Sequence, residues 1–224
     1  MLRQGKVFRR SRCWQATVGG GTLPMAPRLR PFFVVFPGTC GILKKAIKIM
    51  KRNTTLVIGG CRSGKSSHAL DMANQVPGDR KLFIATSVPS DGEMEKRVEK
   101  HRCERGDLWR TAETPVNVAD VIEQEGDCSD VILLDCITLW ISNLFGENFE
   151  ESTISQQVDG LVHAVTNAPC PVFLVSNEVG TGIVPDNALA RQFRDAAGFA
   201  NQRIAAAVSK VIWTVAGIPV TIKS

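Results

Sequence analysis

Short apolar segments alternate with helix-like segments from Thr54 to the end of the chain, and this alternation most constrains the fold. Strands that are apolar throughout are typical of a sheet buried on both faces, and helices between them are typical of parallel strands. The candidate strands are Thr55–Ile58, Leu82–Thr86, Val131–Asp135, Val172–Ser176 and Val211–Val215, with Val220–Lys223 as a candidate terminal edge strand. The candidate helices are Lys65–Gln75, Gly92–Glu104, Val116–Gln124, Thr138–Leu144, Ser152–Thr166 and Leu189–Val208. We therefore expect an α/β fold with a mostly parallel sheet flanked by helices.

The first connection from strand to helix carries a phosphate-binding motif. Its sequence, Gly59-Gly60-Cys61-Arg62-Ser63-Gly64-Lys65-Ser66, matches the P-loop pattern GxxxxGK[ST]. Glycines let backbone amides turn toward phosphate oxygens, and the start of the following helix adds positive potential. Lys65 can neutralise the β and γ phosphates, and the hydroxyl of Ser66 can bind Mg²⁺. The flanking strand and helix make a chance glycine-rich turn a poor alternative, so we expect a P-loop NTPase-like (RecA-like) fold.

The positive charge of the chain is confined to its first 49 residues. Ten of the 27 Lys and Arg residues lie there and no acidic residue does, so residues 1–49 carry +10 and residues 50–224 carry −5. The segment contains Gly and Pro without sustained apolar periodicity, which predicts a disordered extension. Its composition also fits an organelle transit peptide, but Met50-Lys51-Arg52-Asn53 resembles an ordinary start of translation. We favour an over-extended reading frame, followed by one domain over residues 50–224.

Cysteine usage and hydropathy indicate the cellular compartment in which the chain is expected. Its seven cysteines include no CxxC pair, which argues against a disulfide framework or a zinc ribbon. No run of 18 apolar residues is present, so we expect no membrane span. We expect a reducing, cytoplasmic location and, because residues 50–224 are acidic on balance, no nucleic-acid partner.

Two segments that follow buried strands are candidate parts of the site. Asp135 ends a strand where P-loop folds place an acid near the nucleotide Mg²⁺, although an Asp there can also cap the next helix. Asn177–Pro185 is long and glycine-rich for a simple connector, which indicates a binding loop. Arg191, Arg194 and Asp195 follow it. A structural turn with surface ion pairs is the alternative for this second segment.

Of the three histidines, one has chemically suggestive neighbours. His68 lies one turn into the helix after the P-loop and His163 lies on an apolar-rich helix, so we interpret both as packing or surface residues. His101 lies within Arg97–Arg105, where five cationic or potentially cationic side chains could meet a polyphosphate. A solvated helix face with alternating charge is the alternative, and composition alone favours it.

Further motifs follow the P-loop in a fixed order. They are Ala85-Thr86-Ser87, Arg97-Val98-x-x-His101-x-x-x-Arg105-x-x-x-Trp109-Arg110-Thr111-x-Glu113, Asp135-Cys136-Ile137-Thr138-Leu139-Trp140-x-x-Asn143-Leu144, Asn177-Glu178-Val179-Gly180-x-Gly182-Ile183-Val184-Pro185 and Arg191-x-Phe193-Arg194-Asp195-x-x-Gly198-x-x-Asn201-Gln202. Together they resemble the bifunctional adenosylcobinamide kinase/adenosylcobinamide-phosphate guanylyltransferase family of cobalamin biosynthesis. The resemblance covers about residues 54–224. Its departures are the N-terminal extension and Gly106, where a proline is common in the family.

The resemblance implies two transfer reactions at one nucleotide site. ATP or GTP phosphorylates the aminopropanol hydroxyl of adenosylcobinamide, and GMP then passes from GTP through an enzyme histidine to give adenosylcobinamide-GDP. The resemblance assigns that histidine to His101 and implies a homotrimer. The nucleotide contacts expected are Gly59, Gly60, Cys61, Arg62, Ser63, Gly64, Lys65, Ser66, Ala85, Thr86, Ser87, Arg102, Cys103, Glu104, Arg105, Glu113 and Asp135. Lys65 is expected to be catalytic, and Ser66 and Asp135 are the expected Mg²⁺ ligands.

Two other functions share part of this sequence pattern. A different P-loop kinase would use the P-loop and Asp135 but would have no use for His101. A RecA-like, nucleic-acid-dependent ATPase would use the basic extension for binding, but the negative charge of residues 50–224 counts against it.

Overall fold

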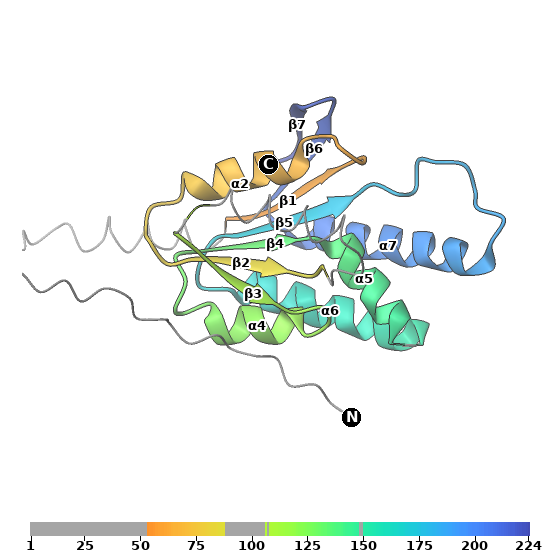
Figure 1. Cartoon of the computed structure of the whole chain (residues 1–224), viewed down its shortest axis with the longest axis horizontal. Coiled ribbons are helices and arrows are strands. Elements are labelled where there is room, and N and C mark those ends of the chain that lie inside the picture. Colours follow the sequence, from red (N-terminus) through yellow and green to blue (C-terminus); the bar gives the residue numbers. More distant parts are fainter. Residues whose placement is uncertain (1–52, 88–105, 107, 148–149) are drawn as a thin grey trace, which may run out of the picture.

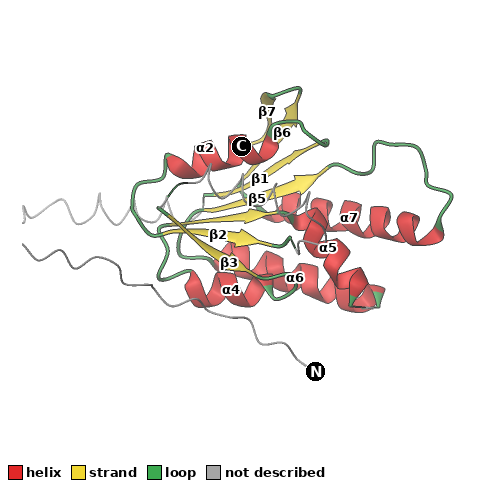
Figure 2. Cartoon of the chain, in the orientation of Figure 1, coloured by secondary structure: helices red, strands yellow, loops and turns green. Residues whose placement is uncertain are grey.

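The computed structural model describes residues 53–87, 106, 108–147 and 150–224. Within these residues, seven strands form one sheet in the order β3-β2-β4-β5-β1-β6-β7 (Figures 1 and 2). The strands are β1 (Thr54–Gly59), β2 (Lys81–Ala85), β3 (Trp109–Glu113), β4 (Val131–Asp135), β5 (Val172–Asn177), β6 (Lys210–Val215) and β7 (Ile218–Lys223). All neighbouring strands pair in parallel except β6 and β7, which form an antiparallel hairpin at one edge.

Five described helices cover the two faces of the sheet. They are α2 (Lys65–Asn74), α4 (Val118–Glu125), α5 (Ile137–Gly146), α6 (Glu151–Asn167) and α7 (Ala188–Ala207). Helix α2 lies on one face, and the other four lie on the opposite face (Figure 1). Within the described residues, no helix has both the length and the apolar character needed to cross a membrane.

The central strands are buried on both faces because their side chains alternate between two apolar cores. In β1, Leu56 and Ile58 pack into the larger core beneath α4 to α7, whereas Val57 packs into the smaller core beneath α2. The same alternation recurs in β2 and β4, as the side-chain period of two requires. Trp140 of α5 is fully buried in the larger core, and its indole Nε1 donates to the carbonyl of Val116 (2.7 Å).

The strand order is that of a P-loop NTPase-like, RecA-like fold, which confirms the expectation from sequence. Strand β5 separates β1, which leads into the P-loop, from β4, which ends in Asp135. The predicted strands and described helices are all present, with ends displaced by no more than two residues. The candidate helix Gly92–Glu104 lies outside the described residues.

Strand β3 was not predicted from the sequence. Its five residues read Trp-Arg-Thr-Ala-Glu, and only Trp109 is buried. The strand lies at the sheet edge and pairs with β2 alone. Its side chains therefore lack the apolar run that identifies a central strand.

Candidate nucleotide-binding site

Two residues of the P-loop have a positive φ, a backbone conformation that favours glycine. Gly64 has a φ of 88° and caps the N-terminus of α2, and Arg62 has a φ of 56°. The amide of Ser63 donates to the carbonyl of Gly60 (3.3 Å), which closes the turn, and the amide of His68 donates to Gly64 (3.0 Å) as α2 begins. A turn followed directly by a helix N-terminus presents backbone amides and positive potential to an anion.

The side chain of Lys65 folds back across the P-loop and is held there by a hydrogen bond from its ammonium group. The side chain is buried, and Nζ donates to the carbonyl of Gly60 (3.1 Å). This contact turns the ammonium group back toward the loop instead of outward into solvent. A cation in this position can neutralise phosphate oxygens bound by the same loop.

The base of the P-loop is fixed by the strands on both sides. The amide of Glu178, just after β5, donates to the carbonyl of Gly59 (3.0 Å), and the amide of Gly217, between β6 and β7, donates to the carbonyl of Ser63 (3.0 Å). A Cβ atom on Gly59 would lie 2.5 Å from the carbonyl oxygen of Thr214 and 2.6 Å from Ser63 Oγ. Only glycine therefore fits at the first position of the motif.

Three predicted contact residues lie in one row across the carboxyl edge of the sheet. Ala85 of β2 pairs with Glu113 of β3 on one side and with Asp135 of β4 on the other. Asp135 is half-buried, whereas Glu113 is exposed. Glu113 lies four strand spacings from β1, roughly 19 Å. It therefore cannot contact the same phosphate group as Lys65.

Thr86 joins the ends of β2 and β4. Its hydroxyl accepts a hydrogen bond from the amide of Cys136 and donates to the carbonyl of the same residue, both at 2.9 Å. The carbonyl of Thr86 in turn accepts from Nδ2 of Asn143 in α5 (2.7 Å). The segment Ala85–Ser87 is therefore fixed beside Asp135, although Thr86 itself is fully buried and its hydroxyl is already used.

Cys136 follows Asp135, and its burial disfavours the reactive thiolate form. Burial raises the pKa of its thiol to about 11, and the negative charge of Asp135 acts in the same direction. Its Sγ accepts from the amide of Leu139 (3.4 Å) and caps α5. The residue therefore has a structural role at neutral pH.

A closed ring of hydrogen bonds, which sequence reasoning missed, holds the end of β5. The amide of Asn177 donates to Thr138 Oγ1 (2.7 Å), which lies 3.3 Å from Ser176 Oγ. Ser176 Oγ donates to Asn201 Oδ1 (2.6 Å), and Asn201 Nδ2 returns a bond to the carbonyl of Asn177 (3.2 Å). Since Ser176 has one proton, Thr138 must donate to it, and all four bonds run in one direction.

The loop after β5 is attached to the sheet at its start and to α7 at its end. Arg191 Nη1 donates to the carbonyls of Pro185 (2.9 Å) and Asp186 (2.7 Å). Asn187 caps α7 through Oδ1, which accepts from the amide of Ala190 (3.1 Å). These contacts hold both ends of the loop, and its predicted role in binding stays a prediction.

The structure describes two of the three histidines and only part of the predicted nucleotide contacts. His101 and the predicted contacts Arg102, Cys103, Glu104 and Arg105 lie outside the described residues. His68 is half-buried in α2, and His163 lies beside Asn167 on α6. Within the part of the chain that the structure describes, no group of three or more His, Cys, Asp or Glu side chains could hold a metal ion.

Comparison with known proteins gives matches over most of the chain. Residues 55–222 match the family model described as cobinamide kinase / cobinamide phosphate guanyltransferase. The "Bifunctional adenosylcobalamin biosynthesis protein CobU" of Salmonella typhimurium is 44% identical over 180 residues, which cover 75% of this chain and 98% of the relative. The Escherichia coli protein of the same name is 41% identical over 180 residues, with the same coverage. The "Bifunctional adenosylcobalamin biosynthesis protein CobP" of Pseudomonas aeruginosa is 38% identical over 168 residues, which cover 75% of this chain and 96% of the relative.

Solved structures give weaker matches. The flagellar accessory protein FlaH of Methanocaldococcus jannaschii has a TM-score of 0.43 and 14% identity, over 81% of this chain and 84% of its own. The RadB recombinase has a TM-score of 0.42 and 15% identity, over 73% and 74% of the two chains.

Proposed function

Because this chain belongs to the cobinamide kinase / cobinamide phosphate guanyltransferase family, we propose that both reactions of the family take place at the nucleotide site built on its P-loop. The protein is a bifunctional transferase of adenosylcobalamin biosynthesis. It phosphorylates cobinamide and transfers GMP to the resulting phosphate. In our proposal the kinase substrate is adenosylcobinamide, ATP or GTP is the phosphoryl donor, and GTP is the GMP donor.

The observation that carries this proposal is the arrangement of the P-loop and its lysine. The ammonium group of Lys65 is folded back over the loop, and the loop is fixed by hydrogen bonds from the segments after β5 and β6. One triphosphate held in this way can present its γ phosphate to an acceptor hydroxyl or its α phosphate to an enzyme nucleophile. Glu113, at roughly 19 Å from β1, can contribute only at the nucleoside end of such a ligand.

The residues at the edge of the sheet also fit Mg²⁺ as a cofactor. Ser66 lies half-buried in the first turn of α2, and Asp135 lies half-buried at the end of β4. Mg²⁺ prefers oxygen ligands and takes only one or two from the protein, together with phosphates and water. We propose that Ser66 and Asp135 hold the ion. When bound, Mg²⁺ neutralises charge that develops on the transferring phosphoryl group.

The guanylyl transfer is proposed to use His101 as a nucleophile, a role that rests on the family resemblance. An imidazole nitrogen attacks the α phosphorus of GTP, forming a P–N bond as the bond to pyrophosphate breaks. A phosphate oxygen of cobinamide phosphate then attacks the same phosphorus, and the P–N bond breaks to release the imidazole. Lys100, Arg102 and Arg105 are expected to lower the pKa of His101 and so keep it neutral and nucleophilic.

Labelled GTP tests this scheme. Incubation with α-labelled GTP and Mg²⁺, followed by denaturation, is expected to leave label on the protein, whereas γ-labelled GTP leaves none. His101→Ala should abolish the adduct and guanylyl transfer but retain at least part of the kinase activity, because a hydroxyl acceptor needs no enzyme nucleophile. His163→Ala, on the surface of α6, is the matched control. Label retained by the His101 variant would transfer the role to another residue such as His68 or Lys100.

Lys65→Ala tests whether one site serves both reactions. Both activities are expected to fall together, because one P-loop holds the triphosphate in each. Loss of only one activity would require a second nucleotide site.

The homotrimer, the domain boundary and the cytoplasmic location remain parts of the proposal. Support for an assembly comes from the outer face of the β6–β7 hairpin, where five large apolar side chains are exposed: Trp213, Val215, Ile218, Val220 and Ile222. Such a patch is typical of an interface. Light scattering is expected to give the mass of three chains. Deletion of residues 1–49 is expected to leave both activities intact, and a cytoplasmic location is proposed from the cysteine usage alone.

A further inference from the structure

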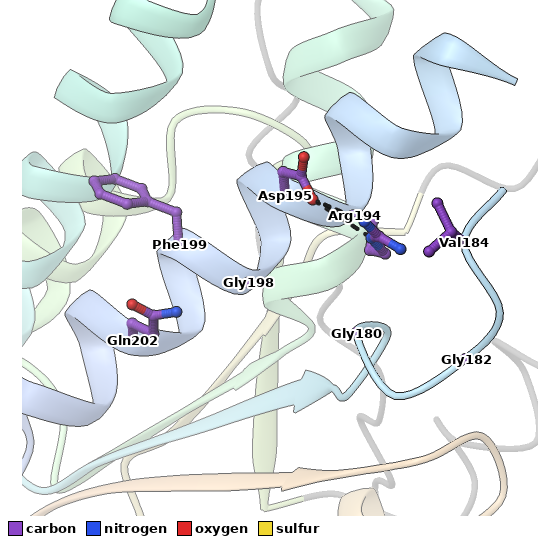
Figure 3. A pocket seen from close by; sticks show the side chains of 8 residues that line it. All are labelled: Gly180, Gly182, Val184, Arg194, Asp195, Gly198, Phe199 and Gln202. Carbon is purple, nitrogen blue, oxygen red and sulfur yellow. Dashed lines mark hydrogen bonds and ion pairs between the residues drawn. The ribbon is translucent and has the colours of Figure 1, made fainter.

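A cavity of about 470 Å³ lies between α7 and the loop after β5 (Figure 3). One side of it is formed by residues on one face of α7, which include Arg194, Gly198, Phe199 and Gln202. The opposite side is formed by the loop, with Gly182 and Val184. Among the described residues, none of those assigned above to nucleotide or metal binding lines it.

The cavity is fixed beside the P-loop by the attachments of the loop that covers it. At the start of the loop, the amide of Glu178 donates to the carbonyl of Gly59, the first residue of the P-loop. At its end, Arg191 of α7 holds Pro185 and Asp186 through their carbonyls. Because α2 and α7 lie on opposite faces of the sheet (Figure 1), this cavity lies on the α7 side, opposite to the face that α2 covers.

Arg194 is the one cationic side chain among the described residues that line the cavity, and it is available to an anionic ligand. Arg194 extends from α7 toward Val184, and its side chain is 22% exposed (Figure 3). Its ion pair with Asp195 is long, because Nε and Nη2 both lie 3.4 Å from a single carboxylate oxygen. Asp195 itself is 73% exposed and extends into solvent. Among the described residues, Arg194 Nη1 has no hydrogen-bond partner, so a phosphate can take this donor.

The rest of the lining suits a ligand with an apolar body and amide groups. Phe199 is 38% exposed and Val184 is 58% exposed, although both are apolar, and the neighbouring Ile183 is 96% exposed. Gln202 adds an amide that can pair with amides of a ligand. Among the described residues, and apart from the neighbouring residues and backbone of α7 itself, no atom lies within 4 Å of a Cβ atom added to Gly198, so the helix surface there is open. A few polar groups within apolar walls are typical of small-molecule sites.

We propose that this cavity binds the cobinamide acceptor, with Arg194 on the phosphate of cobinamide phosphate and the apolar rim against the corrin ring. The inference rests on the proposed function for the identity of the acceptor. A corrin ring with its amide side chains is larger than the cavity, so only the phosphorylated aminopropyl arm and the adjoining ring edge enter it. The remainder of the ring lies over the exposed side chains of the loop.

Replacement of Arg194 tests the charge contact. Arg194→Ala is expected to raise the KM for cobinamide phosphate in guanylyl transfer by about ten-fold or more, since a charge-assisted hydrogen bond is lost. The KM for GTP and the amount of GMP adduct formed with GTP alone should stay within about two-fold of wild type, as should the kinase KM for unphosphorylated cobinamide. Arg194→Lys should recover part of the loss. Arg80→Ala, which removes an ion pair with Asp130, is the control.

A second variant tests the space itself and does not threaten the fold. Gly198→Leu fills an open surface of α7 and replaces glycine with a better helix former, so its melting temperature should not fall. It is expected to raise the KM for both cobinamide and cobinamide phosphate by about ten-fold, while the KM for GTP changes little.

The outcomes separate this inference from the proposed function. An equal rise in the KM for GTP, or loss of the GMP adduct in Arg194→Ala, would assign the cavity to the nucleotide and overturn the inference. Unchanged acceptor KM values in both variants would also overturn it. Calorimetric titration with cobinamide phosphate, without GTP, reports on Arg194 even if the histidine step fails. A wild-type protein that forms no GMP adduct but binds cobinamide phosphate through Arg194 would refute the histidine step alone.

Discussion

Gly59→Ala is expected to distort the P-loop of the unliganded protein. The backbone of Gly59 is buried, and an added Cβ would lie 2.5 Å from the carbonyl oxygen of Thr214 in β6. Cβ atoms do not approach other heavy atoms below 3.0 Å, so either β6 or the P-loop must move by about 0.5 Å. The second close atom, Ser63 Oγ at 2.6 Å, belongs to a buried side chain of the same loop.

The expected loss of stability follows from these two contacts. Overpacking of a well-packed site costs about 1–3 kcal/mol. Replacement of glycine by alanine offsets roughly 0.4–1 kcal/mol of this through the lower entropy of the unfolded chain. The two ranges combine to a net loss of about 0–2.6 kcal/mol. Because two close contacts must be relieved at once, we expect about 1–2 kcal/mol, which lowers the melting temperature of a protein of this size by about 2–8 °C.

Urea and thermal unfolding without nucleotide measure the effect, with Gly60→Ala as the matched control. Within the described part of the chain, and apart from the two neighbours of Gly60, no atom lies within 4 Å of a Cβ atom at this position, so this variant should unfold at the wild-type midpoint or slightly above it. The affinity of Gly59→Ala for GTP should fall as well, because Ser63 and the loop amides are displaced. Equal stability of the two variants, or a loss below about 0.5 kcal/mol in Gly59→Ala, would refute the steric argument.

Three further outcomes are expected. Asn201→Ala should destabilise the protein by about 1–3 kcal/mol in urea unfolding, because it opens the buried ring of hydrogen bonds; a smaller loss would show that water replaces the amide. Arg110→Ala should lower stability by less than about 1 kcal/mol at pH 7, where its hydrogen bond lowers the pKa of Glu125 from 4.5. The difference in unfolding free energy between wild type and Arg110→Ala should shrink as the pH falls below 4.5, because Glu125 becomes protonated as the pH passes through its lowered pKa. A difference that stays constant with pH would contradict the ion-pair argument. At pH 8, iodoacetamide should modify the exposed Cys61 unless GTP is bound, whereas Cys136, with a pKa of about 11, stays unmodified; peptide mass mapping shows which thiol reacted.

The central part of the fold was predictable because its signals are local. Strands β1, β2, β4 and β5 are buried on both faces, so each has an apolar run that can be read without any knowledge of its neighbours. The P-loop is contiguous, and its glycine and lysine requirements act within eight residues. Strand β3 has no such signal, because its position at the sheet edge leaves most of its side chains outside the core.

The supporting structure around the site was not predictable, because it joins residues that are distant in sequence. Ser176 and Asn201 are 25 residues apart, and Thr138 lies 38 residues before Ser176. Single Ser, Thr and Asn residues are also common on surfaces, so their identity alone does not indicate burial. The long β5–α7 loop was predicted to be a binding loop from its length and its glycines. The side chains of α7 that face this loop depend on how the helix packs against it, which the local sequence does not indicate.

The two reactions place opposite demands on the two sides of this site. In the proposed function the donor side binds a triphosphate in each reaction, and its parts are correspondingly fixed: Lys65 is buried, and Thr86 is fully buried and hydrogen-bonded. The acceptor side must bind a neutral hydroxyl arm first and a phosphorylated arm second. A guanidinium that is already loosely paired with Asp195 suits this change, because its charge is balanced while the arm is neutral and a phosphate can compete for it afterwards. A strongly buried, unpaired arginine would bind the phosphorylated arm much more tightly than the neutral arm. It would therefore slow the movement of the kinase product out of the position in which it was phosphorylated.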